Sequence, residues 1–241
     1  MKKWKTKSGV EIIQVLNGRS NSYLICSEHG NILVDTGKSS DFIRLQTNIE
    51  ALKLPKKSID FLILTHTHFD HCQNASFIKE LYQCKIIVSN AEADFSQQGY
   101  TPLPNGTFTI SRLISKMGNR IGKRRFGYQP FIPDMWISGE TILKGFPIQI
   151  IPTPGHSKGS ISIIVDKEIA LVGDTLFGVF RNSVFPPFAD DVKEMVKSWG
   201  LLLDTRCCIF LPGHGSEIKQ ELLQKESDKL TRKQSFSKNK R

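Results

Sequence analysis

The segment FLILTHTHFDHCQN, residues 61–74, places three histidines and an aspartate within six positions at the end of an apolar run. The chain holds six histidines, so half of them lie in this one stretch. Side-chain packing gives no reason for three imidazoles at this spacing, and protonated imidazoles would repel one another. FLILT has the composition of a buried strand, so the cluster H-x-H-x-D-H lies on the loop that leaves it. The pattern predicts a metal site at the end of a core strand.

Three further loops have the same layout, in which an apolar strand is followed by a histidine or an aspartate. They are TPGH (153–156), GDT (173–175) and PGHG (212–215). Together with the first loop they hold five of the six histidines. If the strands are neighbours in the core, their loops meet at one rim, which is where sites often form in layered folds.

These loops supply seven candidate metal ligands: His66, His68, Asp70, His71, His156, Asp174 and His214. Imidazole nitrogen with carboxylate oxygen is a ligand set that suits zinc, and iron and manganese accept it as well. Seven ligands are too many for one tetrahedral ion. They fit two divalent ions joined by a carboxylate and a water, an arrangement that lowers the pKa of the water to near 7.

The remaining pattern predicts an α/β (α+β) fold in which a meander of strands is followed by alternating strands and helices. We expect strands at 10–16, 22–26, 31–35, 61–65, 85–89, 147–151, 160–165, 168–173 and 207–211, and helices at 41–53, 74–83, 90–97, 190–204 and 217–230. Residues 1–230 then form a single domain. Residues 99–141 break the rhythm and are expected to be an inserted loop or helical excursion of the lid type. Residues 231–241 are expected to be a disordered basic tail.

The net charge of +10 is unevenly distributed along the chain. Residues 112–125 hold six Lys or Arg residues and no acid, and both ends of the chain are basic. Such segments attract nucleic acid or anionic ligands, or they are simply solvated surface.

Several features indicate the compartment. The chain has five cysteines and no CxxC, which favours free thiols in a reducing compartment over a disulfide framework. The basic N-terminus lacks the apolar stretch of a signal peptide, and no apolar run approaches the roughly 20 residues of a membrane span. We therefore expect a cytoplasmic protein without a membrane partner.

Taken in order, THTHFDH, TPGHSKGS, GDTLF and PGHG resemble the metallo-β-lactamase-fold hydrolases over about residues 10–216. The resemblance implies a four-layer αβ/βα sandwich of two mixed β-sheets flanked by helices. It assigns His66, His68 and His156 to one ion, assigns Asp70, His71 and His214 to a second, and places Asp174 between them. It also implies that Asp35, in the stretch LVDTG, orients the first histidine loop by hydrogen bonding.

The motifs also bear on the branch of the family. GDTLF and the complete ligand set are similar to glyoxalase II, a hydroxyacylglutathione thioesterase, and the TPGH form is similar to lactonases. Only residues 216–241 follow PGHG, whereas glyoxalase II has a longer C-terminal helical domain that contacts glutathione. The main zinc class of lactamases carries Cys at the place of Asp174, so antibiotic hydrolysis is not expected.

The resulting hypothesis is hydrolysis of a small-molecule carboxylic ester, thioester or lactone by a metal-bound hydroxide, with Asp70 also positioning the attacking water. Two alternatives stay open: a metal-dependent nuclease or phosphodiesterase that uses the basic segments, and an iron-bound enzyme similar to persulfide dioxygenases. Candidate contacts to an anionic substrate are Lys158, Arg124, Arg125 and Tyr128. Phe177, Phe180, Phe185 and Phe188 either wall an apolar pocket or belong to the core. The oligomeric state stays open.

Overall fold

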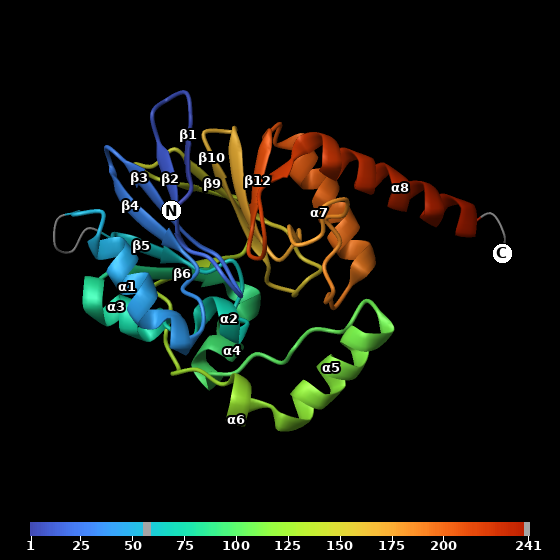
Figure 1. Ribbon diagram of the computed structural model, residues 1–241, viewed down its shortest axis with the longest axis horizontal. Coiled ribbons are helices and arrows are strands. Elements are labelled where there is room, and N and C mark those ends of the chain that lie inside the picture. Colours follow the sequence, from blue (N-terminus) through green and yellow to red (C-terminus); the bar gives the residue numbers. More distant parts are fainter. Residues whose placement is uncertain (55–58, 239–241) are drawn as a thin grey trace.

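The computed structural model describes residues 1–54 and 59–238, with residues 233–238 described by their backbone only. Two mixed sheets pack face to face (Figure 1). The first sheet holds seven strands in chain order: β1 (Lys3–Lys5), β2 (Glu11–Leu16), β3 (Ser22–Ser27), β4 (Gly30–Val34), β5 (Phe61–Ile63), β6 (Lys85–Ser89) and β7 (Met135–Ile137). β1 to β4 form an antiparallel meander, and β4 to β7 run parallel.

The second sheet has the order β13-β12-β11-β10-β9-β8. Its strands are β8 (Thr141–Leu143), β9 (Ile148–Pro152), β10 (Ile161–Val165), β11 (Ile169–Gly173), β12 (Ile209–Pro212) and β13 (Ile218–Lys219). Neighbours are antiparallel except β11 and β12, which are parallel. Alternate side chains of both sheets, such as Ile12, Ile63 and Ile163, meet in the apolar core between them.

Helices cover both outer faces and complete the four layers. On the first sheet lie α1 (Phe42–Glu50), α2 (Phe69–Cys72), α3 (Ala75–Tyr82) and α4 (Ala93–Gln98), with two 3₁₀ turns, η1 (Ser39–Asp41) and η2 (Asn90–Glu92). On the second sheet lie α7 (Val192–Asp204) and α8 (Gln220–Lys238). Each helical layer buries an apolar stripe against its sheet. Leu45 of α1 belongs to the same buried cluster as Leu33, and Trp199 of α7 belongs to the same cluster as Val172. The expected α/β sandwich is confirmed.

The excursion at residues 99–141 is largely helical. It contains α5 (Thr109–Ile121) and α6 (Lys123–Phe126), and then β7 joins the edge of the first sheet. An irregular or helical insertion was expected here, and the structure places α5 and α6 in this segment. The expectation missed β7, whose three residues are too few to give a periodic signal.

The ends of α1 and α8 differ from expectation. α1 ends at Glu50, three residues before the expected end at residue 53. α8 continues to Lys238, so the prediction of a disordered tail is wrong for residues 231–238, and residues 239–241 are not described. The segment from Gln220 to Lys238 has neither Pro nor Gly and is rich in Lys, Gln, Glu and Leu, which favour helix. Within residues 1–54 and 59–238, none of the helices combines the length and the apolar character needed to span a membrane.

Candidate metal centre

The four ligand-bearing loops meet at one rim of the sandwich, where backbone hydrogen bonds join them. The N–H of Gly213 donates to the carbonyl of Gly173 at 2.7 Å, which joins the loops after β12 and β11. The N–H of Ile161 donates to Thr65 at 2.9 Å, which joins the two sheets. The loops are therefore held by the ends of core strands and by one another.

The structure brings all seven candidate ligands together in three overlapping groups. These are His66, His68 and His156; His66, His71 and Asp174; and Asp70, His71 and His214. Within each group the ligand atoms lie within 4.8 Å of one another. Asp174 lies between the histidines, because its Oδ1 is 3.4 Å from His71 Nε2 and its Oδ2 is 3.1 Å from His214 Nε2.

The inward-facing nitrogens have the arrangement that a cation requires. Nδ1 of His68 lies 3.0 Å from Nε2 of His156, and Nε2 of His71 lies 3.3 Å from Nε2 of His214. Nε2 of His66 is buried and has no hydrogen-bond partner in the described residues. Buried polar atoms normally have partners, so an unpartnered nitrogen facing other nitrogens fits a bound metal ion. The donor set of imidazoles and carboxylates suits a divalent ion of the zinc type.

The opposite ring nitrogens are fixed by the protein. Nδ1 of His71 donates to Oδ2 of Asp35 at 2.8 Å, and Nδ1 of His156 donates to the carbonyl of Phe188 at 2.9 Å. Nδ1 of His214 donates to the carbonyl of Arg19. A proton held on Nδ1 leaves the lone pair of Nε2 directed at the centre of the cluster, which is the usual way that proteins orient metal-binding histidines.

Asp35 has the position that the resemblance implied. Besides His71, its carboxylate accepts hydrogen bonds from the backbone N–H and the hydroxyl of Thr65, both at 2.8 Å. Asp35 itself has φ of 58°, a left-handed conformation that Asp tolerates better than most residues. One buried carboxylate thus joins the end of β4 to the first ligand loop.

The protonation of the cluster follows from burial and from Asp174. Burial and the neighbouring histidines hold the pKa of His66 and of His68 well below its usual value, so both rings are neutral at pH 7. Burial opposes charge on His71 and His214 as well, but the carboxylate of Asp174 outweighs it and raises the pKa of both rings. Burial acts against the ionised form of Asp174, yet His214 and His71 hold its pKa well below the usual range. Positive charge is therefore favoured beside Asp174, where a metal cation would replace these protons.

A buried glutamate that the sequence did not single out connects two ligand loops. Oε2 of Glu92 accepts hydrogen bonds from the N–H of Thr67, at 3.2 Å, and from its hydroxyl. Oε1 accepts from the hydroxyl of Ser157 at 2.8 Å and from the N–H of Gly159 at 3.1 Å. Thr67 lies between His66 and His68, and Ser157 follows His156. Glu92 therefore fixes the spacing of the three histidines of the first group.

Gly213 is required where the fourth loop passes over the ligands. A Cβ on this residue would lie 2.6 Å from Cε1 of His71 and would collide with Oδ1 of Asp174. The PGHG motif thus lets the backbone approach the metal ligands closely before His214 turns toward them.

A cavity of about 290 Å³ opens above the cluster. Ligands His68, Asp70, His156, Asp174 and His214 line it, and its apolar wall is formed by Phe69, Leu103, Pro104, Ile114, Phe126, Phe177, Pro186, Pro187 and Phe188. Arg19 is the one Lys or Arg among these described lining residues. Its Nε is 3.8 Å from Oδ2 of Asp70, and its guanidinium carbon is 5.7 Å from the centre of the Phe69 ring.

The four candidate substrate contacts lie outside this cavity lining. Arg124 and Arg125 are exposed on α6, and Lys158 is exposed beside a separate surface pocket with Asp190 and Asp191. Tyr128 is buried, and its hydroxyl pairs with that of Thr101 at 2.8 Å. Their sequence positions near the ligand loops do not reveal which way the side chains point.

Three of the four phenylalanines fit one of the two alternatives, and Phe180 fits neither. Phe177 and Phe188 line the cavity, Phe185 packs against Trp199, and Phe180 is exposed. Arg19 and the wall residues of the excursion were missed because they reach the site from segments without a ligand motif.

Comparison with known proteins agrees with the fold and identifies the family. Residues 16–214 match the Metallo-beta-lactamase superfamily. A probable metallo-hydrolase of Methanocaldococcus jannaschii is 36% identical over 169 residues, which cover 69% of this chain and 73% of that protein. The hydroxyacylglutathione hydrolase GloC of Haemophilus influenzae is 32% identical over 215 residues, which cover 86% of this chain and 91% of that protein.

Solved structures share the architecture at low sequence identity. The superfamily protein ST1585 of Sulfolobus tokodaii aligns with a TM-score of 0.66 at 19% identity, covering 91% of this chain and 86% of that one. The B3 metallo-β-lactamase BLEG-1 aligns with a TM-score of 0.66 at 20% identity, covering 91% of this chain and 99% of that one. These likenesses concern the fold. With the family match over most of its length, this chain belongs to the metallo-β-lactamase superfamily.

Proposed function

We propose that the protein is a hydrolase that cleaves a small-molecule thioester at a pair of divalent metal ions, with zinc as the expected metal and with carboxylic esters and lactones as related substrates. The observation that carries the proposal is the convergence of seven histidine and aspartate donors, five of which line a mostly apolar cavity.

Each ligand group has a role in this proposal. His66, His68 and His156 would hold one ion, Asp70, His71 and His214 would hold the other, and Asp174 would contribute to both. When bound, two such ions lower the pKa of a water to near 7 and polarise the carbonyl oxygen of the substrate. Asp35, Glu92 and the carbonyl of Phe188 hold the ligand rings in place.

Asp70 is the residue that we expect to act on the attacking water. Its side chain faces the cavity, with Oδ2 3.7 Å from Nε2 of His214 and 3.8 Å from Nε of Arg19. A carboxylate at this place would accept a hydrogen bond from a water molecule and so orient the lone pair of the water toward the substrate carbon.

The side chains around the cavity favour a good leaving group. Among the described lining residues, each titratable side chain other than Arg19 belongs to the ligand set, so none is free to protonate a departing alkoxide. A thiol has a pKa near 8.5 and leaves as a thiolate without a proton donor. This argument favours a thioester over an unactivated ester or a phosphodiester.

The shape of the cavity fits a small acyl compound with an anionic group. Phe69, Phe177 and Phe188 offer apolar surface, and Arg19 offers a single positive charge at the rim. The similarity to GloC supports a hydroxyacyl thioester, because the match covers 91% of that hydroxyacylglutathione hydrolase. A short C-terminal region therefore does not separate this chain from enzymes with that name.

The two alternatives receive less support. A nuclease needs cations along a phosphate path to the metal site, whereas the basic residues of α5 and α6 are not among the cavity-lining residues. An enzyme similar to persulfide dioxygenases would bind its iron through fewer ligands than the seven that converge here.

A substrate panel tests the proposal. We would supply S-lactoylglutathione, a second acyl thioester, a lactone, an aryl ester and a phosphodiester to the metal-loaded protein, and would measure kcat/KM for each. We expect the thioesters to be the best substrates. Cleavage of the phosphodiester alone, or oxygen uptake without hydrolysis, would contradict the proposal.

A further inference from the structure

α5 presents its large apolar side chains to solvent. Ile110 is 75% exposed, Leu113 60%, Met117 56%, Ile114 51% and Ile121 48%. At 100° per residue these five side chains form one continuous stripe along the helix. We call these five residues the α5 stripe. An ordinary surface helix turns such a stripe toward the core, and exposed apolar patches mark interaction sites.

The face of α5 next to the stripe fixes this orientation. The buried residues of the helix are Ser111, Ser115 and Gly118, which are small. A Cβ on Gly118 would collide with Leu103, so the helix approaches the segment beneath it closely. The helix cannot rotate to bury the stripe without forcing Ile or Met side chains into this narrow space.

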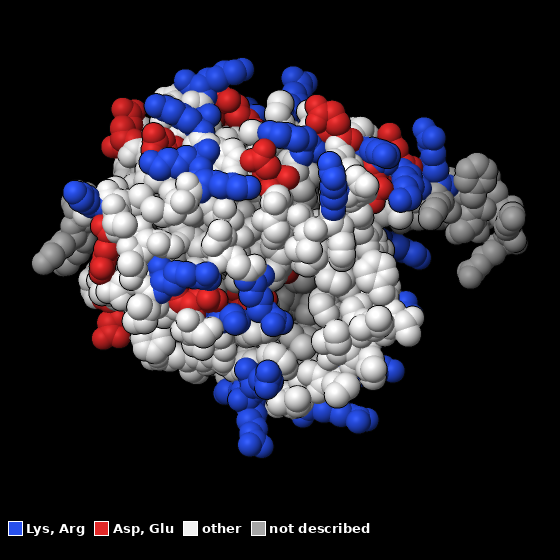
Figure 2. All heavy atoms as spheres, viewed as in Figure 1, with Lys and Arg blue, Asp and Glu red and all other residues white. Residues whose placement is uncertain are grey.

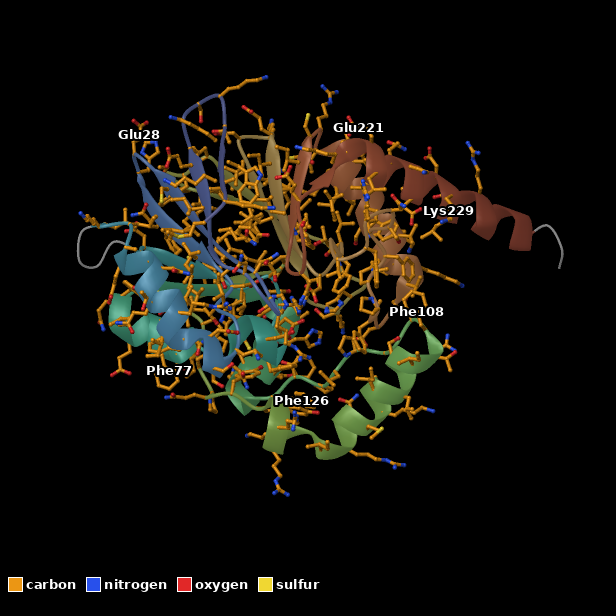
Figure 3. All side chains as sticks on the ribbon, in the orientation of Figure 1. Glu28, Phe77, Phe108, Phe126, Glu221 and Lys229 are labelled. Carbon is orange, nitrogen blue, oxygen red and sulfur yellow. The ribbon has the colours of Figure 1, made fainter. Side chains whose placement is uncertain are left out.

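The start of α5 and the end of α6 are both anchored to the body of the protein. At the start of α5, Phe108 contacts Phe185 with ring centroids 6.0 Å apart, and in α6 Phe126 contacts Phe69 at 4.8 Å (Figure 3). The hydroxyl of Ser111 closes the first turn by pairing with the backbone N–H of Phe108 at 3.0 Å. The α5 stripe is therefore held outward.

Positive charge borders the stripe. Residues 112–125 carry Arg112, Lys116, Arg120, Lys123, Arg124 and Arg125 without any acid. Figure 2 shows Lys and Arg, and no acid, along the edge of the molecule where α5 and α6 lie. On the helical wheel Arg112, Lys116 and Arg120 form a second stripe directly beside Leu113.

We propose that α5 and α6 dock the protein on an anionic lipid surface. A helix with an apolar stripe, adjoining Lys and Arg residues and no acid lies in the plane of a lipid interface, with its apolar side chains among the acyl chains and its cations among the headgroups. This departs from the expectation of no membrane partner, which rested on the absence of a spanning segment.

Other possible binding partners would match only the apolar or only the charged part of this surface. A second copy docked by the same face would bring six cations against six cations, which is repulsive. Nucleic acid would neutralise the charge but would leave the α5 stripe in water. An anionic lipid surface supplies both the apolar and the negative component.

The docked orientation also has a consequence for the cavity. Ile114 belongs to the α5 stripe and lines the cavity, and Leu103 and Phe126 beside it are lining residues as well. Docking would therefore bring the cavity mouth to the lipid surface.

Flotation with vesicles tests the proposal. The full chain is mixed at low salt with vesicles of phosphatidylcholine alone or of an equal mixture with phosphatidylglycerol. We expect binding to the mixed vesicles only. Replacing three cations that do not line the cavity, Lys116→Gln, Arg120→Gln and Arg124→Gln, should weaken binding on the order of a hundredfold. The matched control removes three cations at the opposite end of the chain, Lys2→Gln, Lys5→Gln and Lys7→Gln, and should keep most of the binding.

The apolar component is tested separately with the triple variant Ile110→Ser, Leu113→Ser and Met117→Ser, which should weaken binding about tenfold or more. Its control replaces three exposed apolar residues elsewhere, Ile43→Ser, Ile142→Ser and Leu201→Ser. Absence of vesicle binding, equal losses in the controls, or a dimer in sedimentation velocity that the apolar variant dissociates would overturn the proposal. Hydrolysis of a soluble thioester should be unchanged in all these variants, so docking and the hydrolytic function are judged independently.

Discussion

His68 provides the most direct test at the scale of single residues. Its Nδ1 faces Nε2 of His156 at 3.0 Å, whereas His29, the one histidine outside the ligand loops, is exposed beside Glu28. We expect His68→Ala to lose bound metal and to lower kcat/KM by more than about 100-fold, because a ligand is removed. His29→Ala should retain both, and metal analysis with kinetics on both variants checks this. Equal metal content in the two would count against His68 as a ligand.

Asp35 should act through His71 rather than on the substrate. Asp35→Asn keeps the size of the side chain but replaces an anionic acceptor of three hydrogen bonds by an amide. We expect metal affinity to fall about 10–100-fold because the ring of His71 is less firmly oriented. Competition with a chromophoric chelator measures the affinity. An unchanged affinity would show that the Asp35 charge is unimportant for the site.

The residues that could be predicted from the sequence are those with a motif of their own. The H-x-H-x-D-H cluster indicates a metal site by itself, the other donors gain support from it because their loops also follow apolar strands, and Asp35 was implied by the family resemblance. Arg19 reaches the cavity from the turn between β2 and β3, and its carbonyl binds His214, which is far away in the sequence. Lys158 is near His156 in the sequence but points to another surface, because proximity along a loop does not determine the direction of a side chain.

At the scale of elements, Glu92 joins the loop after β5 to the loop after β9. Four donor groups point at its two oxygens, so Glu92→Gln must turn its amide N–H toward at least one of them. We expect a loss of about 1–3 kcal/mol in the free energy of unfolding and a lower kcat. Chemical denaturation and kinetics measure both. Glu28→Gln, on an exposed side chain, is the control, and equal behaviour of the two variants would refute this role.

The loop after β12 passes close to His71 and Asp174 at Gly213, and this gives a second test at the scale of elements. Gly213→Ala should reduce metal binding and activity, because the new Cβ meets His71 and Asp174. Gly139→Ala is the matched control, since a Cβ there meets nothing within 4 Å. Metal content and kcat/KM of both variants are compared. Normal metal binding by Gly213→Ala would mean that the loop has more room than the structure shows.

The long core strands and the helices that cover the sheets could be predicted, because their apolar periodicity matches their burial. The orientation of α5 could not be predicted in this way. A periodic apolar stripe identifies one face of a helix but does not say whether that face meets the core or solvent, and here Ser111, Ser115 and Gly118 occupy the inner side. β7 was missed because its three residues show no periodic pattern. The end of α8 was missed because no helix-breaking residue marks where the helix stops.

At the scale of the whole molecule, metal should stabilise the fold. The ligand loops join both sheets, so an ion that binds only the native state raises the free energy of unfolding by about 2.7 kcal/mol at 100 times its Kd. For a domain of this size that corresponds to an increase in Tm of about 5–10 °C. Thermal unfolding before and after chelation, and after return of zinc, measures the effect. A Tm that is indifferent to chelation would contradict a site between the sheets.

The central claim is that the histidine and aspartate cluster binds metal to hydrolyse a thioester. The most direct measurement is to add zinc stepwise to metal-free protein and to follow thioester hydrolysis and bound metal on the same sample. We expect no hydrolysis without metal and a rise that levels off at about two ions per chain, because seven ligands in overlapping groups are enough for two ions. Hydrolysis that persists after complete removal of metal would contradict it.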